Sequence, residues 1–108
     1  MAQDFERAIA RNVGTSASTI LTSDSDDAVI GIRLSNILTS AINVSVYVTT
    51  STLDYYLVKD VSIPPASAVE IIQGGSKVVL QSGDALKVVS DTASSTDVWV
   101  SYIDTISA

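Results

Sequence analysis

Short runs rich in valine and isoleucine recur along this chain, and clusters of Gly, Pro, Asp and Ser separate them. The clearest run is 42–49, where apolar side chains at the even positions alternate with polar or aromatic ones at the odd positions. A period of two is typical of a β-strand that buries one face. Strands about 8 to 12 residues apart indicate a β-sandwich or a small barrel. Further strands are predicted at 16–22, 28–37, 55–61, 69–72, 77–81, 85–90 and 98–103.

Two local signals refine this prediction. The run 77–80 is followed by Gln-Ser-Gly-Asp and then by a second run, 85–88, which together predict a β-hairpin. Gly31 interrupts the strand 28–37 and indicates either a β-bulge or a close approach of another segment.

The composition also indicates an all-β protein. Val, Ile, Ser and Thr are abundant in the 108 residues, whereas Glu and Lys, which surface helices use heavily, are scarce. A chain of this length corresponds to one domain. We therefore expect a single antiparallel β-sandwich, jelly-roll or immunoglobulin-like, of about eight or nine strands. The sandwich is expected over 14–108, after an N-terminal arm, 1–13.

The predicted arm fits two kinds of secondary structure. Phe5, Ile9 and Val13 recur at a spacing of four, which is a helical stripe, but with Arg7 and Arg11 they also share one face of a strand. A segment this short needs a surface on which to dock. That surface is either its own sandwich or a neighbouring subunit.

The charge balance argues against two classes of partner. The formal net charge is −6, which opposes binding to nucleic acid because phosphates require a basic footprint. It also provides no attraction to anionic membranes. The segment 1–13 lacks an apolar core, so no signal peptide is expected, and no apolar run approaches the ~20 residues of a membrane helix.

The sequence contains neither cysteine nor histidine. Disulfides and thiolate nucleophiles are therefore excluded, and the commonest general base and metal ligand is missing. The aspartates fall mainly in turns or beside basic residues, and no spacing singles out a catalytic pair. We expect no enzymatic activity, no catalytic residues and no cofactor.

The acidic segment 23–27 is the nearest approach to a metal site. Asp24, Asp26 and Asp27 offer the carboxylate oxygens that hard cations bind. The Gly and the bidentate Glu of an EF-hand loop do not follow at the required spacing. A solvated acidic turn is therefore the favoured interpretation, and a metal site is the weaker alternative.

Strand alternation places two aromatic side chains on outer faces. Trp99 points away from Val98 and Val100, and Tyr47 points away from the valines on either side of it. Such residues are partly buried under loops, contact another subunit or stack on a sugar. We predict Tyr47 and Trp99, with Phe5 and Ile9 of the arm, as interface residues.

The order and spacing of several short motifs carry a family resemblance over essentially the whole chain. After an opening stretch at 5–13, these motifs are GTS (14–16), TILT (19–22), VIGIRLSN (29–36), VSVYV (44–48), YYLVK (55–59), IPPAS (63–67), KVVL (77–80), GDAL (83–86) and DVWVSY (97–102). In their order and spacing the chain resembles small β-sandwich structural proteins encoded by tailed bacteriophages, especially marine and cyanobacterial ones. Pro65 and the acidic segment 23–27 depart from that pattern.

The resemblance implies a non-enzymatic virion protein, assembled in the host cytoplasm, that decorates or stabilises the neck, tail or outer head. Its partners would be copies of itself and other virion proteins of the capsid, neck or tail, with no nucleic acid or membrane involved. An alternative stays open, a carbohydrate- or receptor-binding module of a fibre or tail tip. That module would use Tyr47, Tyr55 or Trp99 as a stacking surface.

Overall fold

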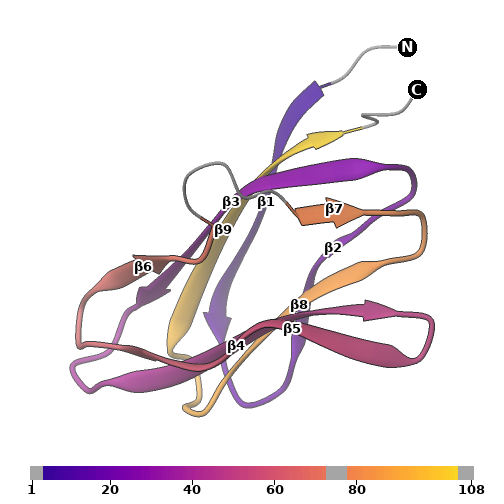
Figure 1. Ribbon diagram of the computed structural model, residues 1–108. Coiled ribbons are helices and arrows are strands. Elements are labelled where there is room, and N and C mark those ends of the chain that lie inside the picture. The colour runs from indigo at the N-terminus through magenta and orange to yellow at the C-terminus, as the bar shows by residue number, and fades with distance from the viewer. Residues whose placement is uncertain (1–3, 73–77, 105–108) are drawn as a thin grey trace.

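The computed structural model describes residues 4–72 and 78–104, which form nine strands and no helix (Figure 1). The predicted all-β sandwich is confirmed: the strands make two antiparallel sheets packed face to face. No described residue belongs to a helix long and apolar enough to cross a membrane. The strands are β1 (Asp4–Val13), β2 (Ser18–Thr22), β3 (Asp27–Asn36), β4 (Ile42–Thr50), β5 (Leu53–Ile63), β6 (Ala68–Glu70), β7 (Val78–Leu80), β8 (Ala85–Ser90) and β9 (Thr96–Asp104).

The strand order is that of a jelly roll. The five-stranded sheet has the order β1-β9-β3-β6, with β7 also paired to β3, and the four-stranded sheet has the order β2-β8-β4-β5. The pairs are nested about the β4–β5 turn, because β3 pairs with β6 and β7, β2 with β8, and β1 with β9. This is a long antiparallel hairpin wrapped into two sheets, which distinguishes a jelly roll from an immunoglobulin-like sandwich.

Because the strands pair in this nested order, the segments that connect them also lie side by side at the ends of the sandwich. The connection from β2 to β3 lies beside the connection from β7 to β8, and backbone hydrogen bonds join them. Ser23 N–H donates to the carbonyl of Asp84, and Gly83 N–H donates to the carbonyl of Ser23, each at 2.8 Å. Gly83 has a φ of 94°, a conformation that favours glycine.

The other two pairs of connections are held in the same way. Asn36 N–H donates to the carbonyl of Ser67 at 2.8 Å, and Ser95 N–H donates to that of Val13 at 3.0 Å. At Gly14 the two connecting segments approach so closely that an added Cβ would lie 3.0 Å from the backbone nitrogen of Ser94. Backbone polar groups at the ends of the sandwich are thus satisfied by the partner connection.

The predicted hairpin at 77–88 is wrong. β7 pairs with β3 in one sheet, whereas β8 pairs with β2 and β4 in the other, and Figure 1 shows the two strands diverging from their turn. The predicted turn at Gln81–Asp84 is present and forms backbone hydrogen bonds with Ser23, but the chain passes from this turn to the second sheet. Leu80 on β7 and Leu86 on β8 therefore enter the same core from opposite sheets, and both are buried. Lys77 lies outside the described residues.

The core lies between the sheets and contains the residues that alternation predicted. Val44, Val46, Val98 and Val100 are buried, and so are Ile32, Leu34 and Val88. Full burial of each such side chain contributes about 1.5–3 kcal/mol. At Gly31 the predicted bulge is present, since the pairing of β3 with β9 shifts between Val29 and Gly31. The alternative of close packing is not, because an added Cβ would meet nothing within 4 Å.

The segment predicted as an arm is part of the sandwich. Within the described residues it is the strand β1, not a helix, and it pairs with β9 from Asp4–Asp104 to Val13–Thr96. Val13 is buried in the core. Of the two docking surfaces considered, this segment uses its own sheet, so the sandwich includes β1 rather than beginning at residue 14.

Candidate functional site

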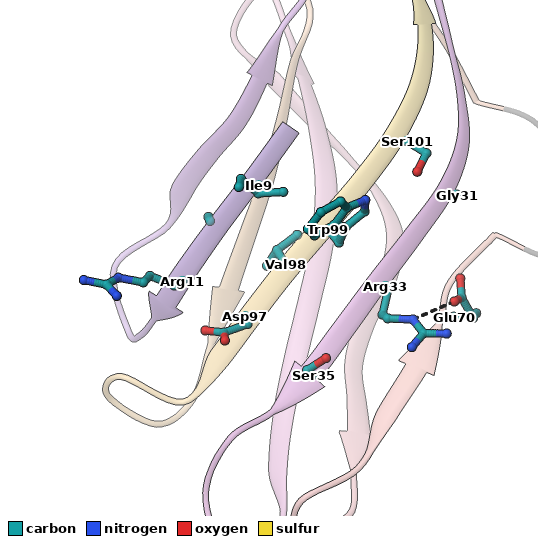
Figure 2. Close-up of a pocket in the computed structure, with 11 residues that line it drawn as sticks. Ile9, Arg11, Gly31, Arg33, Ser35, Glu70, Asp97, Val98, Trp99 and Ser101 are labelled. Atoms are coloured by element: carbon teal, nitrogen blue, oxygen red, sulfur yellow. Dashed lines mark hydrogen bonds and ion pairs between the residues drawn. The ribbon is translucent and has the colours of Figure 1, made fainter. Parts of the chain in front are cut away.

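A groove of about 810 Å³ lies on the outer face of the five-stranded sheet. Side chains from β1, β9, β3 and β6 line it, and Figure 2 shows Trp99 near its middle. The volume falls within the usual range of ligand-binding clefts. Since the sheet buries its other face in the core, this groove is available without disturbing the fold.

The centre of the groove is a row of side chains, one from each strand. Trp99 pairs with Ile9 of β1 on one side and with Arg33 of β3 on the other, and Arg33 pairs in turn with Glu70 of β6. Directly paired residues of adjacent strands point to the same face. The register therefore sets an apolar side chain, an indole, a guanidinium and a carboxylate side by side.

Trp99 points outward as alternation predicted, with 47% of its surface exposed. The Arg7 guanidinium lies 5.1 Å from the centre of the Trp99 ring. A cation–π contact at such an exposed position contributes about 0.5–1 kcal/mol. The indole is therefore held in place while much of it faces the groove.

An ion pair and small side chains complete the lining. Arg33 Nε donates to Glu70 Oε1 at 2.9 Å, drawn as a dashed line in Figure 2. Ser35, Ser101 and Gly31 line the same groove. The short side chains leave the space between the larger ones open, and the serine hydroxyls add hydrogen-bonding groups.

The charge of this face differs from that of the whole chain. The arginines of the sequence are Arg7, Arg11 and Arg33, and all of them line the groove or contact Trp99. Two carboxylates, Glu70 and Asp97, accompany them. Asp97 accepts a hydrogen bond from Asn12 N–H at 3.0 Å, which directs this carboxylate towards the backbone of β1. The two lining arginines therefore balance the two lining carboxylates, and Arg7 adds one positive charge beside Trp99, on a chain whose net charge is −6.

The predicted interface residues divide between two faces. Phe5 and Ile9 are exposed and share the outer face of the five-stranded sheet with Trp99. Tyr47 lies on the four-stranded sheet, outside the core cluster, and is only 9% exposed. Its ring centre lies 5.0 Å from that of Tyr56, which covers it. Tyr47 is thus less accessible than the interface prediction requires, because alternation did not reveal the neighbouring ring.

The environment of Tyr47 affects its titration. Burial raises the pKa of its hydroxyl, and the nearby carboxylate of Asp54 raises that pKa further. Tyr55 pairs with Val48, whereas Tyr56 pairs with Tyr47, so the two adjacent tyrosines of β5 point to opposite faces. The structure does not bring Tyr47, Tyr55 and Trp99 into a common aromatic surface.

The acidic residues gather differently from the prediction. Among the described residues, carboxylate oxygens of Asp24, Asp27 and Asp104 lie within 4.8 Å of one another, and Asp26 is not in this group. Asp27 is 2% exposed, and its Oδ2 accepts a hydrogen bond from Ser23 Oγ at 2.9 Å. Serine hydroxyls therefore stabilise the buried carboxylate. Asp104 was missed because the end of β9 meets the start of β3 only in the folded sheet.

The groove itself was not predicted. The sequence held two indications of it, the outward position of Trp99 and the shared strand face of Arg7, Ile9 and Arg11. No local pattern indicates, however, that β1 pairs with β9. No protein-family model, curated protein sequence or solved structure matches this chain.

Proposed function

We propose that this chain is a non-enzymatic structural or accessory protein of a virion, which contacts copies of itself and neighbouring virion proteins. The observation that carries the proposal is the edge strand β1, ten residues long and with Phe5 77% exposed near its start. Jelly rolls are common among viral capsid proteins, but fold alone does not assign function. The resemblance to phage virion proteins and the edge strand together support the neck, tail or outer head as its place.

The edge of β1 offers a means of assembly. β1 pairs with β9 on one side only within the described residues, so its other side presents backbone donors and acceptors. Addition of a strand at such an edge joins two sheets through main-chain hydrogen bonds. A two-fold axis beside β1 would pair the strand with the same strand of a second copy.

The charges of β1 disfavour several registers for this pairing and are compatible with the one centred on Ala8. An antiparallel pair centred on Ala8 sets Phe5 opposite Arg11 and Arg7 opposite Ile9 of the second copy, with no like charges opposed. A pair centred on Arg7 sets the two copies of Arg7 opposite each other, and a pair centred on Glu6 does the same with the two copies of Glu6. Centring on Ile9 sets Arg7 opposite Arg11.

The register can be tested with charge variants at one position. Phe5→Glu should retain self-association in native mass spectrometry and analytical ultracentrifugation, because the new carboxylate meets Arg11 of the second copy. Phe5→Arg should weaken association at least about tenfold, because it opposes two cations. Leu53→Ser is the matched control, since Leu53 is also exposed but lies on β5 of the other sheet.

Two results would contradict the proposal. Equal effects of Phe5→Glu and Phe5→Arg would reject the register centred on Ala8. A wild-type protein that stays strictly monomeric at high micromolar concentration and does not co-sediment with assembled heads or tails would reject the structural function itself.

A further inference from the structure

We propose that the groove on the five-stranded sheet binds an acidic oligosaccharide, whose sugar ring stacks at Trp99 and whose carboxylate pairs with Arg33. This activity is separate from self-association. The edge of β1 lies in the plane of the sheet, whereas the groove lies on its outer face, so a monomer suffices for binding.

The shape of the groove suits an extended ligand. It crosses four strands, has a volume of about 810 Å³ and opens to solvent along the face shown in Figure 2. A chain of sugars fits such an open groove better than a small molecule that needs enclosure on all sides. Ser35 and Ser101 place hydroxyl groups along the groove, where they can exchange hydrogen bonds with sugar hydroxyls.

The centre of the row provides the stacking surface. Trp99 is half exposed, Ile9 flanks it on β1, and the contact with Arg7 restrains its ring. Aromatic rings bind the apolar face of a sugar through dispersion and C–H contacts. A restrained ring loses little conformational entropy when the ligand arrives.

The arginines argue for a ligand with negative charge. The Nε–H of Arg33 is engaged by Glu70, which orients the guanidinium, and a guanidinium carries five donors in a planar fork. Such a fork matches a carboxylate with two parallel hydrogen bonds. Arg11 lines the same groove, so a second acidic sugar has a cation within the site.

The acidity of the whole chain favours binding of an anionic ligand at this face over the rest of the surface. Outside the groove the molecule is strongly acidic, so an anionic ligand is repelled there more than at this face, where the three arginines outnumber Glu70 and Asp97. The same acidity disfavours a nucleic acid, whose dense phosphates extend beyond three arginines. A short carboxylated sugar chain meets both requirements, since its charges are few and widely spaced.

The test uses the only tryptophan of the chain as the reporter, because that tryptophan lies in the groove. The probe is a tetramer of galacturonic acid, and its fully methyl-esterified form is the neutral control of nearly equal shape. We expect saturable change of tryptophan fluorescence with the acid and at least tenfold weaker binding of the ester. We also expect the affinity to fall with added salt.

Variants then locate the site by calorimetry. Trp99→Ala and Arg33→Gln should each weaken binding of the acid at least tenfold, and Arg33→Gln should reduce the preference for acid over ester. Lys59→Gln on β5 and Tyr55→Ala are the controls for charge and for an exposed aromatic, and both should bind as the wild type does. Thermal melts monitored by circular dichroism confirm that each variant is folded.

Several outcomes would overturn the inference. It fails if neither fluorescence nor heat responds to the acid at millimolar concentration, or if ester and acid bind equally. It also fails if a sulfated oligosaccharide or a single-stranded oligonucleotide of equal charge binds more tightly than the galacturonate. Loss of binding in the two controls, or its retention in Trp99→Ala and Arg33→Gln, would place any binding outside this groove.

Discussion

The outer faces of the two sheets each carry an aromatic residue that strand alternation points outward, yet only one of the two is accessible. Trp99 on the five-stranded sheet is 47% exposed, whereas Tyr47 on the four-stranded sheet is 9% exposed. Trp99 has Ile9 and Arg33 as cross-strand neighbours, whereas Tyr47 has Lys87 and Tyr56. Alternation therefore sets the face of a side chain, and the neighbouring strand decides its exposure.

The largest expected difference between the faces is in stability. Tyr47→Ala should lower the free energy of unfolding by about 2–3 kcal/mol, because it removes a ring that is almost wholly covered. Trp99→Ala should lower it by about 1 kcal/mol or less, because much of the indole already contacts water. Urea unfolding of the two variants measures both. Equal losses would mean that Trp99 is packed as tightly as Tyr47.

The tyrosines extend the comparison to pH. Burial raises the pKa of Tyr102 to about 12, with a further contribution from Glu6, whose Oε1 accepts a hydrogen bond from the tyrosine hydroxyl. In the unfolded chain this group titrates near its ordinary value of 10.0. The stability that it contributes is therefore complete below pH 10 and is lost as the pH rises to about 12.

The free energy of unfolding should fall by about 2 kcal/mol as the pH rises from 10.0 to about 12. The raised pKa of Tyr47 contributes to a loss in the same direction. Unfolding measured across this pH range should show the loss. Tyr102→Phe should remove most of this pH dependence. A dependence unchanged in that variant would assign it to other groups.

The covering of Tyr47 by Tyr56 can be measured directly. Tyr56→Ala should cost about 1 kcal/mol, and a double-mutant cycle with Tyr47→Ala should give a coupling of about 0.5–1.5 kcal/mol. The same cycle between Tyr56 and Trp99 is the control, because these residues lie on different sheets. A coupling near zero for the tyrosine pair would show that some other contact covers Tyr47.

The smallest effects concern the cations above the two aromatic groups. Arg7 lies over Trp99 at 5.1 Å and Lys59 over Tyr56 at 5.3 Å. Arg7→Gln and Lys59→Gln should each cost about 0.5 kcal/mol, and only Arg7→Gln should change tryptophan fluorescence. A fluorescence change in Lys59→Gln would contradict the placement of the two faces on opposite sides of the sandwich.

The positions of most strands, and the side chains that face the core, were accessible from the sequence because both depend on residues close together in the chain. Apolar residues at every second position predicted that Val44, Val46, Val98 and Val100 are buried, and the structure confirms this. The turn predicted at Gln81–Asp84 is also present, and Gly83 within it adopts a positive φ. The hairpin predicted around it does not form, because a turn does not specify whether the next strand returns to the same sheet.

Pairings between distant segments required the folded chain. β1 meets β9, Asp104 joins Asp24 and Asp27, and Tyr56 covers Tyr47 only after the long hairpin has wrapped into two sheets. Local alternation is enough to decide which side chains face inward, because it reflects the pleat of a single strand. It carries no information on which strands become neighbours, and the groove at Trp99 and the exposed edge of β1 arise from those neighbours alone.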